Sequence, residues 1–347
     1  MRRLIFLLFV VTLFQAEGQL KVDSIHSQYV KTYRDHFFLW PVIKRRRLAF
    51  EMEHRGVQEA EPVRFLPNNS FSAGIGAHLF DISFELSAAI PLDEKNKARY
   101  GESTSRDLTA SVGGSNWGLD GLIQQYKGFY VANPEIIPLG TAAYPTRPDV
   151  SMSHTGVVGI YAFNKNKYSL WSSYTHSERQ IKSAGSLLLA GAVSSFRLQA
   201  DSVILSTDAL QRLASTTSFF DMRSTTLGIG PGYGYSFVYG QLFFNLSFSI
   251  GPAHHWIYYV GSDGLDHYDI ALNSYTDFRV GFGYNSDRFF TSVSFVSQTT
   301  TTKVEDLHVN TETMAFRFVA GYRFREKGLL AKTWRDAFPA KWQKYIR

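Results

Sequence analysis

The amino-acid sequence predicts an all-β fold, an antiparallel transmembrane β-barrel of about 12 strands, with 14 possible, and a short C-terminal helix. Apolar and polar residues alternate with period two over most of residues 46–325. Aromatic residues reach 15% of the chain although its mean hydropathy is slightly negative. The rings are therefore dispersed among polar residues, as a sheet with one apolar and one wet face requires. Short polar turns alternate with longer connections, which is the loop pattern of outer-membrane barrels.

The first 18 residues have the features of a signal peptide. Arg2 and Arg3 precede an apolar run of about ten residues, and Ala16-Glu17-Gly18 forms a small-x-small site. We expect cleavage before Gln19 and a periplasmic N-terminal segment over residues 19–45. No later window holds 18 apolar residues, so a membrane crossing requires strands. The chain has no cysteine, which excludes a lipid-acceptor thiol, disulfides and thiolate metal sites.

The strands show the alternation in order along the chain. Residues 82–90 place apolar side chains on even positions, residues 242–250 do the same, and residues 314–324 repeat it near the end. Residues 228–234 put four glycines on one face, where they relieve crowding on a curved inner wall. The predicted strands are 46–53, 69–78, 82–90, 106–113, 117–130, 151–163, 167–178, 183–199, 222–236, 240–256, 271–284, 288–300 and 312–325. Longer connections are expected near 54–68, 91–104, 131–150, 257–270 and 301–310.

Thirteen candidates cannot close a barrel that has both ends on one side, because such a barrel needs an even number. Either residues 183–200 leave a twelve-stranded barrel as an excursion, or residues 201–221 add a fourteenth strand. Ser206 is a suitable N-cap for a helix-like stretch that follows it, which favours twelve.

Positive charge gathers at two places, Lys44 to Arg47 and the tail from Arg323 onward. We expect both to flank the strand region, where they face solvent or headgroups. The net charge of +6 is therefore not taken as a sign of nucleic-acid binding. Residues 326–347 could form a basic amphipathic helix at a membrane interface, or equally a docked or frayed tail.

Three stretches resemble one uncharacterised family, domain of unknown function four-four-two-one, found in Bacteroidetes. They are residues 164–168, the string Ser177-Glu178-Arg179-Gln180-Ile181-Lys182-Ser183-Ala184-Gly185-Ser186, and Gly230 to Tyr235. The resemblance covers most of the chain after the signal. It implies an outer-membrane-type barrel and no established activity. Its motif residues here are Glu178, Arg179, Gln180, Lys182 and Gly185, which could line a pore mouth or form a solvated loop.

Charged residues within the strands are expected to face the lumen, because an arginine on the lipid side at the midplane costs about 2–4 kcal/mol. The inward set is Glu85, Asp107, Asp277, Arg279, Arg317 and Arg323, and Glu51 is expected to face inward with them. Such charges either close the lumen as a salt-bridged plug or leave a narrow charged pathway. The sequence does not choose between them.

A rim cluster offers the weakest site. It comprises His254, His255, His267, Asp263 and Asp266 around an expected loop. Histidines beside carboxylates can activate water, but the spacing matches no catalytic or metal-binding motif, so no catalytic residue, metal or cofactor is predicted.

Rings at strand ends form a further set: Trp117, Tyr130, Trp171, Tyr174, Trp256, Tyr258 and Tyr259. Such rings form interfacial girdles, and a sugar-binding platform is the alternative.

The predicted function is that of a porin-like narrow channel or structural barrel in the cell outer membrane, and not an enzyme. The alternatives are an anchor or partner in surface assembly or secretion, and a barrel-embedded hydrolase at the outer rim. Expected partners are outer-membrane lipid and either a small solute or a surface or secretion protein. A soluble β-sandwich is disfavoured because many strands exceed about nine residues, the length of a tilted bilayer crossing.

Overall fold

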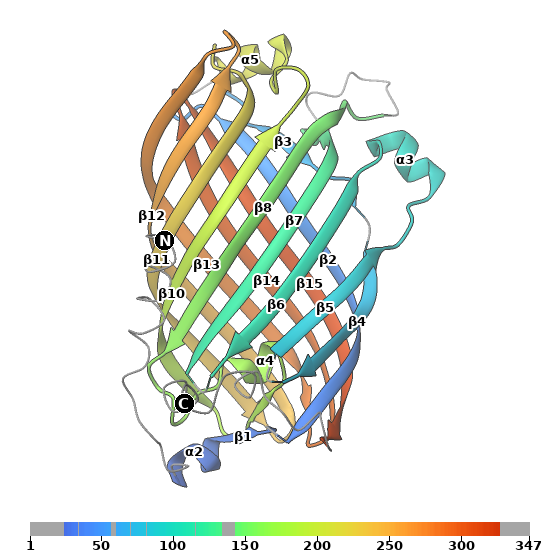
Figure 1. The fold of residues 1–347 in the computed structure, drawn as a ribbon, viewed down its shortest axis with the longest axis vertical. Helices are drawn as coiled ribbons and strands as arrows, with labels where there is room; N and C mark the ends of the chain where they lie inside the picture. Colours follow the sequence, from blue (N-terminus) through green and yellow to red (C-terminus); the bar gives the residue numbers. More distant parts are fainter. Residues whose placement is uncertain are drawn as a thin grey trace, which may run out of the picture.

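The computed structural model describes residues 24–33, 35–56, 60–69, 71–80, 82–114, 116–133 and 143–326. Within them, twelve antiparallel strands form a closed ring, and the pairing of the first and last strands closes it (Figure 1). The strands are β2 (His36–Glu53), β4 (Ser72–Leu79), β5 (Ile82–Ala89), β6 (Thr104–Gly113), β7 (Trp117–Val131), β8 (Thr146–Ala162), β10 (Ala184–Gln199), β11 (Phe219–Tyr239), β12 (Leu242–Gly261), β13 (Asp266–Asn285), β14 (Phe289–Val304) and β15 (Leu307–Arg325). The predicted twelve-stranded barrel is confirmed. The expected signal peptide and the expected C-terminal helix lie outside the described residues.

The wall carries its apolar side chains on the outside, which identifies the solvent as lipid. On β12, Leu242, Phe244, Leu246, Phe248 and Ile250 point outward, and Phe248 is 45% exposed. Asn245 between them is fully buried inside the ring. A soluble sandwich would bury the phenylalanine and expose the asparagine, so the sandwich alternative is wrong. This apolar belt is nine residues long on β12, the length of a tilted strand that crosses a bilayer. No helix among the described residues is long and apolar enough to span a membrane.

The two ends of the barrel differ. β2 begins and β15 ends at one of them, where His36 pairs with Arg325, and we call it the terminal mouth. Helix α5 (Thr207–Leu213) covers the opposite end, the α5 mouth (Figure 1). The predicted cap of α5 is confirmed, because the Ser206 side chain accepts a hydrogen bond from the backbone N–H of Ala209.

The wall is irregular between β2 and β7. The short strand β3 (Val63–Leu66) pairs with the upper part of β2 and with the end of β7. Nearer the terminal mouth, the shorter strands β4, β5 and β6 fill the same interval, and helix α3 (Glu94–Tyr100) connects β5 to β6. β5 and β6 share four residue pairs, from Ile82–Val112 to Glu85–Thr109. Beyond the Glu85–Thr109 pair, toward the α5 mouth, β5 and β6 are no longer paired.

The segment predicted to leave the barrel is a strand of the wall, and the preceding predicted strand is the segment that leaves it. Residues 184–199 form β10, which pairs along its length with β11 and over twelve residues with β8. The predicted strand at 167–178 is wrong, because this stretch leaves the wall and holds helix α4 (Trp171–Tyr174). Its alternating apolar residues are buried against the inner wall instead of facing lipid. The barrel keeps twelve strands because the excursion lies before β10 and not within it.

Several predicted boundaries are also wrong. β2 begins at His36, so residues 36–45 belong to the barrel and Lys44 to Arg47 lie within a strand rather than flanking it. The long connections expected at 257–270 and 301–310 are turns, since β13 begins at Asp266 and β15 at Leu307. Polar residues continue in paired strands there because the wall extends beyond the apolar belt, where both of its faces can be wet.

A hydrophobic core fills the inside of the α5 mouth. Leu213 and Ile204, from α5 and its approach, pack with Phe50, Phe65 and Phe219 of the wall. All five side chains are almost completely buried. This apolar core closes the α5 mouth as the core of a soluble domain would.

Candidate functional site

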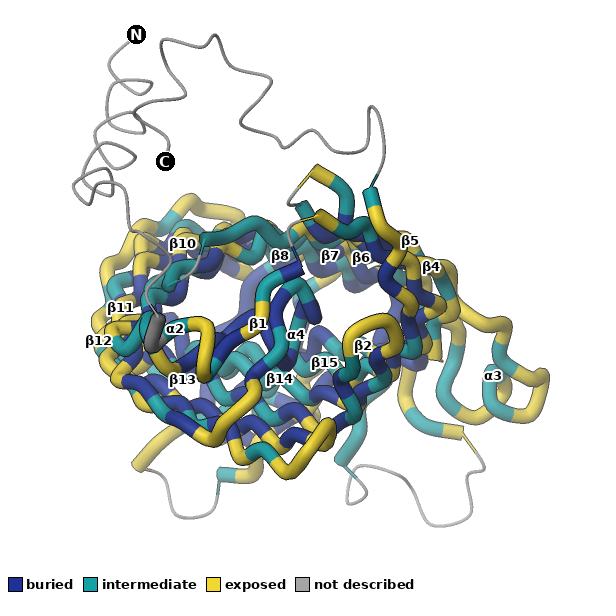
Figure 2. Tube along the Cα trace, turned by 90° about the horizontal axis from the view of Figure 1, so that it is seen from below, coloured by how far each residue is buried: buried dark blue, intermediate teal, exposed yellow. Residues whose placement is uncertain are grey.

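The terminal mouth is closed by two segments of the chain itself. Residues 164–183, which we call the plug, turn into the ring and contain α4 and the short strand β9 (Glu178–Gln180). Residues 24–33, the strap, contain α2 (Ser24–Tyr29) and β1 (Val30–Thr32), which pairs with β9. Seen from the terminal side, α2, β1 and α4 lie within the outline of the ring (Figure 2). The strap and plug therefore lie across the terminal mouth.

Glycines of the inner wall form sockets for the plug. A Cβ atom at Gly118 would lie 2.2 Å from Cζ2 of Trp171, and one at Gly113 only 2.0 Å from the same atom. The indole Nε1–H of Trp171 donates to the carbonyl of Gly114 at 2.8 Å. At Gly234, a Cβ atom would lie 2.5 Å from the hydroxyl of Tyr168. These positions need glycine because the rings of the plug approach the backbone of the wall closely.

Arg323 of β15 holds the far side of the plug. Its side chain is 1% exposed, and its guanidinium donates to the His176 carbonyl at 2.6 Å and the Ser286 carbonyl at 2.6 Å. It also donates to the side-chain oxygen of Asn285 at 2.7 Å and lies 4.0 Å from the ring centre of Tyr33. His176 has a φ of 58°, a left-handed conformation that is costly for residues other than glycine. Arg323 therefore joins the strap, the plug and the wall at one point.

Asn285 adds a second connection that the sequence gave no reason to single out. Its amide donates to the carbonyls of Ser172 and Glu178, both in the plug. In the sequence it stands in an ordinary polar turn, Asn285-Ser286-Asp287. Only the burial of the amide, 3% exposed, reveals that it faces inward.

Arg317 and Glu85 form an ion pair across the lumen. The Nε atom of Arg317 on β15 lies 2.6 Å from Oε1 of Glu85 on β5. The same carboxylate accepts from the indole of Trp40 at 2.9 Å, and Lys44 lies 3.8 Å away. Arg317 also donates to the backbone carbonyl of Tyr174 in the plug at 2.9 Å.

Arg279 makes a second bridge over the plug. Its guanidinium, on β13, contacts Asp277 at 2.8 Å and reaches Asp120 on β7 at 2.9 Å. It lies 5.7 Å from the ring centre of Tyr174. Both bridges tie distant strands together through the lumen, where the surroundings strengthen a satisfied charge pair.

The remaining two of the assigned charges behave differently. Asp107 accepts from the hydroxyl of Tyr126 at 3.2 Å and from Gln124 at 3.1 Å, so it belongs to a local network between β6 and β7. Glu51 was assigned inward, and that assignment is wrong. It pairs with Arg64 of β3 at 3.1 Å and stands with the odd-numbered, outward residues of β2.

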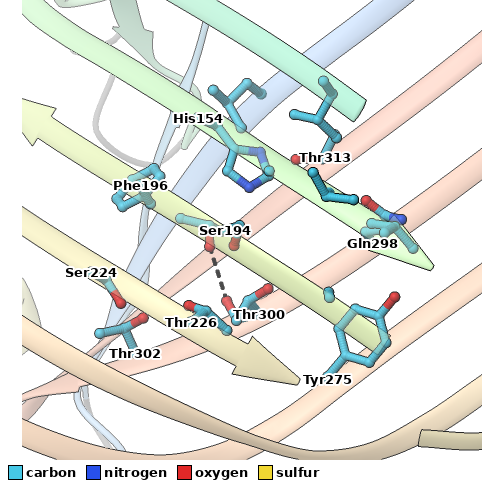
Figure 3. Close-up of a pocket in the computed structure, with 17 residues that line it drawn as sticks. His154, Ser194, Phe196, Ser224, Thr226, Tyr275, Gln298, Thr300, Thr302 and Thr313 are labelled. Carbon is cyan, nitrogen blue, oxygen red and sulfur yellow. Dashed lines mark hydrogen bonds between the residues drawn. The ribbon is translucent and has the colours of Figure 1, made fainter. Parts of the chain in front are cut away.

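A small polar chamber lies between the apolar core and the plug. Ser194, Thr226, Thr300 and Gln298 project into it with His154, and the labelled side chains surround a common space (Figure 3). Its volume is about 30 Å³, room for a few water molecules at most. The chamber is too small to hold a solute.

The residues of the family motif lie at the terminal mouth. Glu178, Arg179 and Gln180 form β9, and Gln180 accepts the backbone N–H of Ser169 at 2.8 Å. The Lys182 ammonium lies 5.4 Å from the ring centre of Tyr29 in α2. At Gly185 a Cβ atom would lie 2.4 Å from the hydroxyl of Tyr233. The motif thus contributes to the plug and to its junctions with the strap and wall.

Asp287 fastens the strap and plug from outside. Lys31 of the strap donates to its carboxylate at 2.8 Å, Tyr33 at 3.1 Å and Arg179 of the plug at 3.2 Å. The Lys31 hydrogen bond lowers the pKa of Asp287 below its ordinary value. The carboxylate is therefore an anion through the neutral pH range.

The rim cluster does not assemble. His255 points inward and bonds Thr226 at 2.8 Å, while His254 points outward and stacks on Trp256. His267 lies 3.5 Å from Asp263, in register with Tyr259, four residues or about 13 Å along the strand from His255. Asp266 accepts from the Tyr258 hydroxyl on the outer face. Within the described part of the chain, no group of three or more His, Cys, Asp and Glu side chains is arranged to hold a metal.

The strand-end rings divide into three groups. Four of the rings stand at outward positions of the wall, as a girdle requires: Trp117, Tyr130, Trp256 and Tyr258. Trp171 and Tyr174 belong to the plug, and Tyr259 points into the apolar core, so their assignment to a girdle is wrong. In the sequence, Trp171 and Tyr174 resemble outward rings because apolar and polar residues also alternate in the plug.

Fold and site together define the class: a transmembrane β-barrel of the outer-membrane type whose described lumen is filled by its own plug and core. The family model for Domain of unknown function (DUF4421) matches residues 21–324, and the chain belongs to this family. Among curated proteins, no sequence matches the chain.

Three solved structures are similar to it at low identity. The outer membrane protease OmpT from Escherichia coli has 9% identity and a TM-score of 0.41, covering 85% of this chain and 98% of its own. The OmpT outer membrane protein of Vibrio cholerae has 10% identity, a TM-score of 0.26 and coverages of 86% and 100%. The β domain of the Bordetella autotransporter BrkA has 10% identity, a TM-score of 0.31 and coverages of 84% and 99%. Similarity at this level says nothing about activity.

Proposed function

We propose that this protein is a closed structural barrel of the outer membrane. It anchors in the bilayer, exposes the strap and plug on its terminal side, and passes no solute. The observation that carries the proposal is the filled lumen. An apolar core occupies one mouth and the plug occupies the other, with a chamber of about 30 Å³ between them. Both obstructions consist of well-packed side chains, which are costly to displace.

A gated channel is the second candidate, and the polar chamber favours it. Serine and threonine side chains line the middle of the lumen, where apolar residues would pack more simply. In a gated channel, displacing the plug alone would open a path. The apolar core argues against this, because Phe50, Phe65 and Phe219 would still block the α5 mouth.

A rim hydrolase receives no support from the cluster on which the sequence-based hypothesis rested. That hypothesis required His255 and His267 to converge on one carboxylate. The two histidines have different partners, Thr226 and Asp263.

A solute-uptake assay tests the closed barrel. Liposomes containing the purified protein are diluted into isotonic solutions of small sugars, and swelling is followed by light scattering. We expect no swelling above protein-free liposomes for the wild type, nor for a variant in which residues 165–181 are replaced by a short turn. Swelling with the wild type would reject the proposal. Swelling only after deletion would favour the gated channel.

We also propose that the exposed strap and plug contact a partner protein on the terminal side. A photoreactive amino acid at Gln28, which is exposed on α2, should give a discrete cross-linked product in cells. The same amino acid at Leu265, 62% exposed at the opposite end, is the matched control and should give none. Absence of a product at Gln28, or equal products at both positions, would remove this part of the proposal.

A further inference from the structure

Two arginines stand at the upper edge of the apolar belt on β2. Leu39 and Ile43 are exposed on the outer face of this strand, 47% and 44%, and Arg45 and Arg47 follow them at the next two outward positions. The guanidinium of Arg45 lies 5.7 Å from the ring centre of Phe71. These side chains therefore leave the apolar zone and reach the level at which lipid headgroups begin.

A cluster of tyrosines lies beside them. The ring of Tyr130, at the end of β7, lies 5.0 Å from the ring of Tyr100 in α3 and 5.5 Å from that of Tyr144. Arg99 covers both Tyr100 and Tyr144 at 5.3 and 5.8 Å. Strand β3 connects the two groups, because Leu66 pairs with Tyr130 of β7 and Phe65 pairs with Phe50 of β2, three residues beyond Arg47. We call these six residues the Arg–Tyr patch: Arg45, Arg47, Arg99, Tyr100, Tyr130 and Tyr144.

A bulge in β7 places Tyr130 in this patch. Gly128 has a φ of +85°, and the register between β7 and β8 changes beside it, since Lys127 pairs with Ser151 but Phe129 pairs with Arg147. Phe129 therefore turns into the apolar core, and Tyr130 turns outward. Without the bulge the tyrosine would point into the barrel.

The positive charge of the patch has no acidic partner among the described residues. No described carboxylate lies within ion-pair distance of Arg45, Arg47 or Arg99. Glu94 and Glu102 pair with Lys97, and Glu51 pairs with Arg64. Glu312 of β15 stands opposite Ala49, one outward position from Arg47, and makes no ion pair with the patch. On β10 and β11, by contrast, outward arginines are neutralised, because Arg197 and Arg223 share the carboxylate of Asp221. Among the described residues, three arginines at the edge of the lipid-facing belt therefore form no ion pair with a carboxylate.

We propose that the Arg–Tyr patch binds the phosphorylated headgroup of a membrane lipid in the leaflet on the α5 side. Guanidinium groups bind phosphate through paired N–H donors, and tyrosine hydroxyls donate to the remaining oxygens or to sugar hydroxyls. The acyl chains of the same lipid would lie on Ile43 and Leu39 below. This juxtaposition of apolar strand and charged edge fits a lipid rather than a free anion.

Native mass spectrometry of the detergent-folded protein tests the proposal. Phosphatidic acid and phosphatidylcholine with identical acyl chains are the probes. We expect selective adducts with phosphatidic acid, and an affinity about 25-fold weaker in the Arg45→Ala/Arg47→Ala double variant, from roughly fivefold per arginine. Both side chains are on the outer surface, so the variant should keep the heat-resistant electrophoretic mobility of a folded barrel.

Arg223→Ala is the matched control, since Arg223 is an outward arginine that has its own carboxylate partner. It should change the affinity for phosphatidic acid by less than a factor of two. Equal binding of the two lipids, or an equal loss in the control, would overturn the proposal. Displacement of the lipid by excess inorganic phosphate would also overturn it, because the site would then recognise a free anion.

Discussion

Removing the Arg323 guanidinium should release the plug while leaving the barrel closed by its strands. Arg323→Ala deprives three buried acceptors of their donor: the carbonyls of His176 and Ser286 and the side-chain oxygen of Asn285. Each unsatisfied acceptor costs about 1–3 kcal/mol. Loss of the buried charge and entry of water offset part of this sum. We therefore expect the free energy of plug opening to fall by about 3 kcal/mol, which is roughly a 150-fold change in its equilibrium constant.

Hydrogen exchange followed by mass spectrometry measures the free energy of plug opening, because buried amides exchange only when the plug opens locally. Peptides from residues 169–181 should exchange about 150-fold faster in Arg323→Ala, while peptides from β11 and β12 keep their protection. Arg223→Ala, at the other end of the barrel, should leave the plug peptides unchanged. Plug exchange within fivefold of wild type would refute the role given to Arg323, and so would a uniform loss of protection in all strands.

Gly118→Ala puts a Cβ atom 2.2 Å from the Trp171 ring, so it should destabilise the plug by about 1–3 kcal/mol and shift tryptophan emission to longer wavelength. Gly121→Ala is the control and should have neither effect, because its Cβ atom meets nothing closer than 3.7 Å. The depressed pKa of Asp287 means that its contribution to stability is complete above the unfolded value of about 3.9 and is lost as pH falls through the lower folded value. Strap peptides should therefore exchange faster only in strong acid, and Asp287→Asn should abolish that pH dependence. Phe248→Arg, on the lipid face, should lower stability in a urea titration in lipid by about 2–4 kcal/mol, and an unchanged midpoint would contradict the belt.

The sequence predicts the wall well because the alternation of side chains has a single physical cause. A residue on a barrel strand faces either lipid or lumen, so Phe244 and Asn245 on β12 reveal their sides without any tertiary information. The same reasoning explains why Arg279, Arg317 and Arg323 lie inside.

The plug could not be predicted in this way. Tyr168 and Leu170 alternate with serines as a strand would, but their surroundings are protein on every side. Alternation does not distinguish a residue facing lipid from one facing a packed interior. The sockets at Gly113 and Gly118 reveal the plug only once its position is known, since a glycine in a strand has several explanations.

The sequence pattern also does not predict where the strands end. Thr301 and Asn310 pair across β14 and β15, although both types are common in loops. They lie beyond the apolar belt, where the period of the pattern weakens and only strand pairing maintains the wall.

Single-channel recording from the purified wild-type barrel in a planar bilayer tests the central claim most directly. Because the apolar core and the plug fill opposite mouths, the account predicts no conductance steps at any moderate voltage from protein that is folded by electrophoretic mobility. Stable open steps whose size changes with Arg279→Ala or Arg317→Ala would show a water-filled path lined by those charges and would contradict the closed barrel.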